Sequence, residues 1–410
     1  MCNDILLDEL SPFIKIHKEQ AMLKTESQQR VIRLQGMLRN KGVQAALLIL
    51  PIDIYYFAGT RQNAILWIPA DGEPMLLVRK SLSRAREESP IADIRPFPSS
   101  KEFSSVFNGD QLSIGMTFDA VPVQQHSYYS RALPGRSFVD ISMIIREVMS
   151  VKSPFELEQL RCSAGKLASV FAEVPQFLKA GMRELDLSAE MEYRLRKAGH
   201  EGYVRMRAFN QELFFGLAVS SGGLCGGFFD GPVTGKGLSS ASPHGASCDE
   251  IRVNEPILLD YAGVFNGYIT DMTRMFAIGT LDPELQRAFD VAIDIQEMVR
   301  QSMKPGAIGE ELFLAAASMA EKAGFGSCFM GMPGEQAKFV GHGVGLELDQ
   351  LPVLAKGFTM ALQTGQVIAV EPKFVIPGKG AIGIENTFAV TDDGGLKLTD
   401  IPDGIVFLEP

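Results

Sequence analysis

Hydrophobic and polar positions near the start of the chain predict a small domain of helices and strands. Residues 27–42, SQQRVIRLQGMLRNKG, carry apolar side chains at helical spacing and end in glycine. The apolar run VQAALLIL at 43–50 predicts a buried strand, and 64–78 predicts two strands around an Asp-Gly turn. We therefore expect an N-terminal α/β domain over residues 1–150, in a chain whose 410 residues make two domains the default.

The boundary of a second domain, 151–410, is predicted where a long helix begins. Ser153 and Pro154 are followed by Glu156, which is a helix-start pattern with proline in the first turn.

The second domain contains a repeat of its hydrophobic pattern. An amphipathic stretch follows Gly181 and ends in Lys-Ala-Gly at 197–199, and another follows Gly306 and ends in Lys-Ala-Gly at 322–324. Each copy comes after a longer helical stretch and before β-rich runs that carry carboxylates. This matching order predicts a duplicated domain with an internal pseudo-two-fold relation.

Two aspartates interrupt the apolar strand pattern of residues 256–279. Asp260 ends an apolar strand, Asp271 lies on the predicted return strand, and the turn is predicted at Gly263, Asn266 and Gly267. A carboxylate on an apolar strand must be paired, hydrogen-bonded or bound to a metal ion. An ion pair between Asp271 and Arg274 is the structural alternative.

Two glutamates interrupt a second strand pair, at 366–394. Glu371 follows VIAV, and Glu385 lies within AIGIENTFAV. A buried ion pair is again the alternative, but we expect neither Lys373 nor Lys379 to reach both glutamates.

One of only five histidines, His342, lies between the two acidic pairs in a glycine-rich segment, VGHGVGL. Four carboxylates and one imidazole suit two divalent cations, with Mn²⁺ or Fe²⁺ indicated by the oxygen-rich set and Co²⁺ or Zn²⁺ compatible by geometry. The histidines without ligand-like neighbours are expected at the surface: His17, His126 and His200.

Composition limits the partners. A formal net charge of −10 disfavours nucleic acid, because phosphate binding needs a basic face. The five cysteines are scattered without a CxxC pair, which favours free thiols in a reducing compartment. Without a long apolar run or a signal-like start, we expect a cytoplasmic protein that does not bind membranes.

The order Asp260, Asp271, His342, Glu371, Glu385 resembles the metal ligands of the pita-bread metallopeptidases, which include methionine aminopeptidase, Xaa-Pro aminopeptidase and prolidase. LLDYAGVFNGYITDMTR, VGHGVGL, VEPKF and GIENT are similar to that family's metal segments, and SASPHGAS is similar to its substrate-side histidine segment, here with His244. DIYYFAGT resembles the creatinase/prolidase N-terminal domain. The resemblance implies a creatinase-like N-terminal domain followed by a pita-bread catalytic domain.

Three positions depart from the family pattern. The family's second histidine is replaced, in DQLP, by Asp349, which cannot donate a hydrogen bond when ionised. The family often has an arginine two residues before the final glutamate, where this chain has Gly383. It often has an aspartate directly after that glutamate, where this chain has Asn386. We interpret this as an intact metal side and an altered substrate side.

The resemblance implies a dinuclear metallohydrolase, an Xaa-Pro aminopeptidase or dipeptidase, that cleaves short peptides and forms a homodimer. It implies Glu371 as general base and His244 as a substrate-orienting residue, with Asp349 acting on the substrate side. Two alternatives stay open. One is a non-peptidase enzyme of this fold, of lyase or amidinohydrolase type, acting on a small organic molecule. The other is a binding protein without catalysis.

Overall fold

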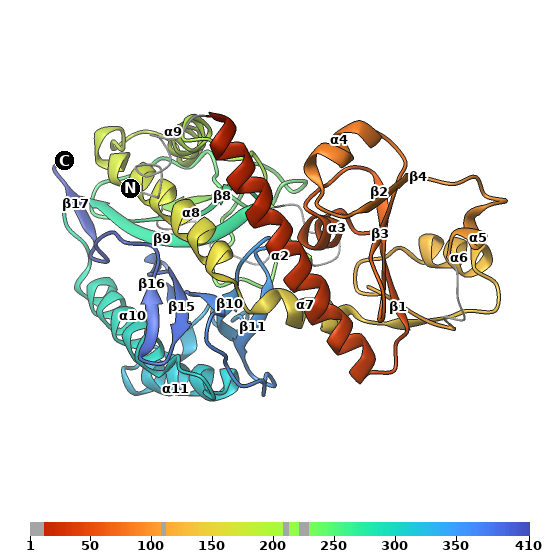
Figure 1. The fold of residues 1–410 in the computed structure, drawn as a ribbon. Coiled ribbons are helices and arrows are strands. Elements are labelled where there is room, and N and C mark those ends of the chain that lie inside the picture. Colours follow the sequence, from red (N-terminus) through yellow and green to blue (C-terminus); the bar gives the residue numbers. More distant parts are fainter. Residues whose placement is uncertain (1–11, 108–111, 208–212, 221–228) are drawn as a thin grey trace. The chain divides into compact units, whose positions relative to one another are not determined.

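The computed structural model describes residues 12–107, 112–207, 213–220 and 229–410, with side chains from residue 23 onward (Figure 1). Described residues up to Met149 form one compact unit, and those from Ser150 form another. None of the helices among these residues combines the length and apolar content needed to span a membrane. Helices and strands mix in both units, as the expected α/β class requires.

The first unit is built on a six-stranded sheet in the order β4-β3-β2-β1-β5-β6. Its strands are β1 (Ala45–Leu48), β2 (Ala64–Pro69), β3 (Met75–Val78), β4 (Asp93–Pro96), β5 (Ser113–Met116) and β6 (Ser137–Asp140). The predicted strands at 43–50 and 64–78 are confirmed as β1 and as the antiparallel pair of β2 and β3. Every residue of these three strands is buried, which explains their unbroken apolar runs.

The helices of the first unit are α2 (Pro12–Asn40), α3 (Pro51–Ala58), α4 (Leu82–Glu88), α5 (Phe103–Val106), α6 (Val123–Ala132) and α7 (Ser142–Ser150). The predicted helix at 27–42 is the second half of α2. Gly42 ends it with a φ of 68°, a left-handed conformation that favours glycine.

In the second unit, the first acidic hairpin is part of a four-stranded sheet in the order β17-β9-β8-β7. Its strands are β7 (Gly216–Ser220), β8 (Pro256–Phe265), β9 (Tyr268–Ile278) and β17 (Val406–Leu408). The turn is two residues, Asn266 and Gly267, with φ values of 51° and 81°. Gly263, predicted in the turn, lies instead within β8, where an added Cβ would be only 3.0 Å from Leu167 Cβ on a covering helix.

The second acidic pair lies where strands pass from one sheet to another. A five-stranded sheet has the order β11-β10-β12-β15-β16, and β13 and β14 form a two-stranded ribbon. The strands are β10 (Phe339–Gly343), β11 (Gln350–Ala355), β12 (Val367–Val370), β13 (Lys373–Ile376), β14 (Gly380–Gly383), β15 (Asn386–Thr391) and β16 (Gly394–Lys397). Glu371 lies between β12 and β13, directly after the apolar run VIAV, whereas Glu385, predicted within a strand, lies between β14 and β15.

The helices of the second unit follow the predicted duplication. They are α8 (Pro154–Glu173), α9 (Glu184–Lys197), α10 (Pro283–Ser302) and α11 (Gly309–Lys322), with short 3₁₀ turns η1 (Val174–Gln176) and η2 (Gly326–Cys328). Helices α9 and α11 each end in lysine, with alanine at the C-cap. Helix α8 packs on β8 and β9, whereas α10 packs on β16 and α11 on β11 (Figure 1). Ser153 and Glu156 form the predicted start of α8 as a reciprocal capping box.

We expected the histidines without ligand-like neighbours to lie at the surface. This prediction is wrong for His200, which is only 2% exposed. Its Nδ1 accepts a hydrogen bond from the Gly202 amide, and its Nε2 is 3.0 Å from the carbonyl oxygen of Ala262. Burial lowers the pKa of His200 to about 4, so the ring is neutral and fills a core position beside Phe215. His126 is half-buried between two phenylalanine rings, and the side chain of His17 lies outside the described residues.

Candidate metal centre

The register of β8 and β9 places both aspartates on one face of the hairpin. Asp260 pairs with Thr273, and Ala262 pairs with Asp271. Directly paired residues share a face, and so do residues two apart on one strand. Asp260, Asp271 and Thr273 therefore point the same way as diagonal neighbours. Arg274, one residue on, points to the opposite face.

The alternative in which Arg274 neutralises Asp271 is therefore wrong. Arg274 is 1% exposed, and its guanidinium donates to the carbonyl oxygen of Glu385 (2.9 Å) and to Asn386 Oδ1 (2.7 Å). It also lies 3.1 Å from a carboxylate oxygen of Asp403.

The pairing of β10 with β12 brings His342 beside Glu371. His342 pairs with Ala369, which shares a face with Glu371 two residues on. The amide of Glu371 donates to the carbonyl oxygen of Val340 (3.0 Å), which extends the strand pairing to the glutamate. The imidazole Nε2 lies 3.4 Å from Glu371 Oε1.

Glu385 joins the two sheets. It forms a backbone bridge with Thr273 of β9, and the Thr273 hydroxyl donates to Glu385 Oε2 (2.9 Å). Both carboxylate pairs therefore meet at one place, as the duplication predicted.

Three of these residues form a compact group that can hold a metal ion. Asp271, His342 and Glu385 each offer a ligand atom, and these atoms lie within 4.8 Å of one another. Glu385 Oε1 is buried and has no hydrogen-bond partner among the described residues. A buried carboxylate oxygen without a donor is costly, so a cation at this position accounts for it.

The imidazole is oriented for the same purpose. His342 Nδ1 lies 2.8 Å from the carbonyl oxygen of Leu348. A carbonyl can only accept, so Nδ1 carries a hydrogen and donates a hydrogen bond to that oxygen. That leaves Nε2 directed at the carboxylates, 3.8 Å from Glu385 Oε1. A histidine that binds a metal usually donates its other ring N–H to a carbonyl in this way. The residues present therefore fit a divalent cation.

Lys373 contradicts one expectation. We expected Lys373 to reach at most one of the two glutamates. Its ammonium contacts both, at 2.7 Å from Glu371 Oε2 and 2.9 Å from Glu385 Oε2. A third contact, 2.9 Å, joins it to Asp260 Oδ2. The prediction failed because it took residues 366–394 as one strand pair, whereas the chain breaks at Glu371 and at Glu385 and turns β13 back toward the carboxylates.

The charges of the cluster strongly favour a cation. Burial and then the charge of Asp260 raise the pKa of Asp271 to about 7, and burial and the charge of Asp271 also raise the pKa of Glu385. Burial opposes a charged His342, but a hydrogen bond to Glu371 and the nearby carboxylate charges outweigh it and raise the pKa to about 10. Burial likewise opposes ionisation of Glu371, but Lys373 and His342 outweigh it and lower its pKa to about 2.

Asn386 does not face the carboxylate cluster. Its side chain donates to Gln296 Oε1 (2.8 Å) and Asp403 Oδ1 (2.9 Å) and accepts from Arg274. The interpretation of Asn386 as part of an altered substrate side is therefore wrong, because residue 386 alternates with Glu385 and points away into a buried polar network.

Asp349 and His244, the two predicted substrate-side residues, lie on loops. Asp349 Oδ1 accepts a hydrogen bond from the backbone N–H of Arg207 (2.8 Å), next to the Leu348 carbonyl that orients His342. His244 is half-buried and stacks on the ring of Phe214, with ring centroids 4.9 Å apart. These positions leave both roles as predictions.

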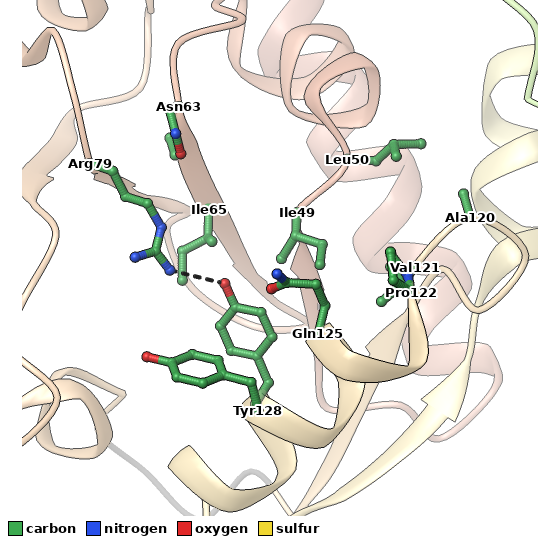
Figure 2. Close-up of a pocket in the computed structure, with 12 residues that line it drawn as sticks. Ile49, Leu50, Asn63, Ile65, Arg79, Ala120, Val121, Pro122, Gln125 and Tyr128 are labelled. Carbon is green, nitrogen blue, oxygen red and sulfur yellow. Dashed lines mark hydrogen bonds between the residues drawn. The ribbon is translucent and has the colours of Figure 1, made fainter.

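A cavity in the first unit is lined by residues other than those of the carboxylate cluster. It holds about 570 Å³ and is lined by residues just after β1, at the start of β2, and in and just before α6, together with Arg79. Figure 2 shows Arg79 and Gln125 among the side chains that line it. Arg79 donates a 3.4 Å hydrogen bond to the hydroxyl of Tyr129. The lining contains none of the predicted site residues, so we place the candidate site at the carboxylate cluster.

Sequence reasoning missed Lys373 as a site residue, although a signal was present. Glu371 and Lys373 are two apart, as are Gly383 and Glu385, and Lys373 pairs with Gly383 across β13 and β14. This alternation places the lysine on the carboxylate face, opposite a glycine that leaves room for it.

Comparison with known proteins extends the resemblance over most of the chain. Residues 158–392 match the sequence profile of metallopeptidase family M24, and residues 30–150 match that of the creatinase/prolidase N-terminal domain. A Pyrococcus furiosus protein named Xaa-Pro dipeptidase is 25% identical over 380 residues, or 90% of this chain and 97% of that protein.

Solved structures share the fold. An Xaa-Pro dipeptidase from Bacillus anthracis has a TM-score of 0.78 at 22% identity, covering 93% of this chain and 100% of that one. An X-Pro aminopeptidase from Thermotoga maritima MSB8 has a TM-score of 0.74 at 24% identity, covering 90% and 98%. These likenesses confirm the expected creatinase-like N-terminal part and pita-bread C-terminal part.

Proposed function

Because the chain belongs to metallopeptidase family M24, we propose that it hydrolyses Xaa-Pro dipeptides at the carboxylate cluster of its second unit. The observation that carries the proposal is the convergence of Asp271, His342 and Glu385 on one buried position. The proline specificity is supported by the Pyrococcus furiosus relative, which matches 90% of this chain.

Enzymes of this family use divalent metal ions, and the ligand types favour manganese here. Carboxylate oxygens outnumber the single imidazole, which suits an ion that prefers oxygen, with iron, cobalt or zinc as alternatives. Asp260 and Glu371 are the remaining proposed ligands, although Lys373 already holds one oxygen of each. A bound divalent cation supplies a Lewis acid that activates water and polarises the scissile carbonyl.

The side chains around that position would handle protons and substrate. Glu371 is the proposed general base, as the resemblance implies, because its carboxylate lies beside His342 at the edge of the group formed with Asp271 and Glu385. His244 is the residue proposed to donate a hydrogen bond to the peptide and hold it in place. Asp349 is proposed to attract the substrate's amino group.

A peptide panel tests the proposal. Purified protein loaded with Mn²⁺ should release proline from Xaa-Pro dipeptides, and a chelator should stop the release. His342→Ala should lose at least about 100-fold in kcat/KM, because it removes a ligand while the surrounding strands keep their core. Turnover of small organic amides or sulfonium compounds with no peptide cleaved would contradict the proposal and favour a non-peptidase enzyme of this fold.

We further propose a cytoplasmic homodimer, as the resemblance to two-domain members of the family implies. Light scattering at micromolar concentration should give twice the chain mass of 44.8 kDa. A mass equal to one chain would contradict the dimer.

A further inference from the structure

Lys373 has the contacts that a bound cation would have. Its side chain is 1% exposed, and its ammonium is within 2.9 Å of carboxylate oxygens from Asp260, Glu371 and Glu385. An ammonium has three N–H donors, so these three acceptors satisfy it completely.

The opposite strand is shaped to admit this lysine. Gly383 pairs with Lys373, and a Cβ added at Gly383 would lie 2.7 Å from Lys373 Cγ and 2.6 Å from the carbonyl oxygen of Pro372. Both distances are far shorter than a carbon contact allows, so a larger residue at position 383 would displace the lysine or the backbone. Lys373 and Gly383 are therefore a matched pair.

The carboxylate oxygens that Lys373 does not contact define one position for a metal ion. Glu385 gives Oε2 to Lys373, while its Oε1 is buried without a hydrogen-bond partner in the described part of the chain. That free oxygen belongs to the group it forms with Asp271 and His342, whose ligand atoms lie within 4.8 Å of one another.

We infer that Lys373 permanently occupies the place of a second cation, so that the centre binds one divalent metal ion, at Asp271, His342 and Glu385. The inference rests on the proposed metal centre but not on its substrate. It replaces the two ions expected from the number of ligand residues with one ion and one ammonium.

Metal counting tests the inference without any peptide. The wild-type chain, saturated with Mn²⁺ and freed of excess ion, should hold one equivalent by elemental analysis and show one site by calorimetric titration. Lys373→Gly, which opens the second position, should hold two. Lys379→Gly is the matched control, since Lys379 lies on the same ribbon but pairs with the surface residues Asp282 and Glu284, and it should stay at one.

Two equivalents in the wild-type chain, or one in Lys373→Gly, would overturn the inference. The wild-type count decides even if Lys373→Gly does not fold. Failure of Xaa-Pro hydrolysis with one bound ion would count against the proposed function alone, so the two failures are distinguishable.

Discussion

At the scale of single residues, side-chain direction on a strand decides which groups share the site. Asp271 and Arg274 are three apart on β9, so they face opposite ways, and Arg274 binds Asn386 instead of the nearby aspartate. The alternation that separates them also places Asp260 beside Asp271. The four carboxylates and His342 could be picked out from the sequence, because each is an ionisable residue in an apolar or glycine-rich run.

Lys373 was missed by the same reasoning, although its two-residue spacing from Glu371 was a signal. Its contacts depend on the chain leaving the five-stranded sheet at Glu371 and returning at Glu385, and no local pattern marks that change of sheet. Asn386 was misinterpreted for a related reason, since its neighbours Gln296 and Asp403 are distant in the sequence.

Asp349→Asn separates charge from hydrogen bonding at the proposed substrate side. Asparagine retains an oxygen that can accept the Arg207 amide, but it loses the negative charge. If the charge attracts the substrate's amino group, kcat/KM should fall by about tenfold or more, or ~1.4 kcal/mol in the barrier. Steady-state kinetics on the best dipeptide check this, and an unchanged kcat/KM would leave Asp349 as a loop anchor.

His200 should make the protein less stable in mild acid. Its pKa is about 4 in the folded chain and about 6.5 when unfolded, so the unfolded state binds more protons between these values. The stabilisation is present above pH 6.5 and is lost as the pH falls toward 4. Between pH 7 and pH 5 the loss should be about 2 kcal/mol.

Comparison with His200→Gln isolates this effect, since glutamine does not titrate. The difference in unfolding free energy between wild type and variant, from urea denaturation, should shrink by that amount at pH 5. A difference independent of pH would show that His200 is not the group responsible.

At the scale of elements, Glu184 on helix α9 fixes two loops through one carboxylate. Oε1 accepts from the amide and hydroxyl of Ser220, and Oε2 accepts from the amide and hydroxyl of Ser247. Ser220 ends β7, and Ser247 follows the segment that carries His244, so the glutamate holds the predicted substrate-side loop against the helix. The start of α8 and the hairpin of β8 and β9 were predictable from local capping and turn signals, whereas this long-range anchor was not.

Glu184→Gln should destabilise the second unit by about 2 kcal/mol, because an amide NH₂ would face donors where the carboxylate accepted them. Glu190→Gln on the same helix is the control. Glu190 pairs with Arg194 at a side-chain exposure of 45%, so its change should stay within about 0.5 kcal/mol. Urea unfolding of both variants tests this, and equal effects would contradict an anchoring role for Glu184.

At the scale of the whole molecule, the two units should respond differently to metal. The carboxylate cluster belongs to the unit that begins at Ser150, and its ligands come from both halves of the duplication. Mn²⁺ at about 100 times its Kd should therefore stabilise that unit by about 2.7 kcal/mol, or roughly 5–10 °C in Tm.

Differential scanning calorimetry with and without Mn²⁺ measures the shift, which should vanish in His342→Ala. An equal shift of the first unit's transition, or a shift that persists in the variant, would show that the ion binds elsewhere.

Anomalous diffraction from crystals soaked in Mn²⁺ tests the central claim most directly. We predict a single manganese peak bound by Asp271, His342 Nε2 and Glu385 Oε1, with the Lys373 ammonium still in contact with Asp260 and Glu371. Two peaks separated by about 3.5–4 Å, as in a dinuclear centre, or no peak at the cluster, would contradict it.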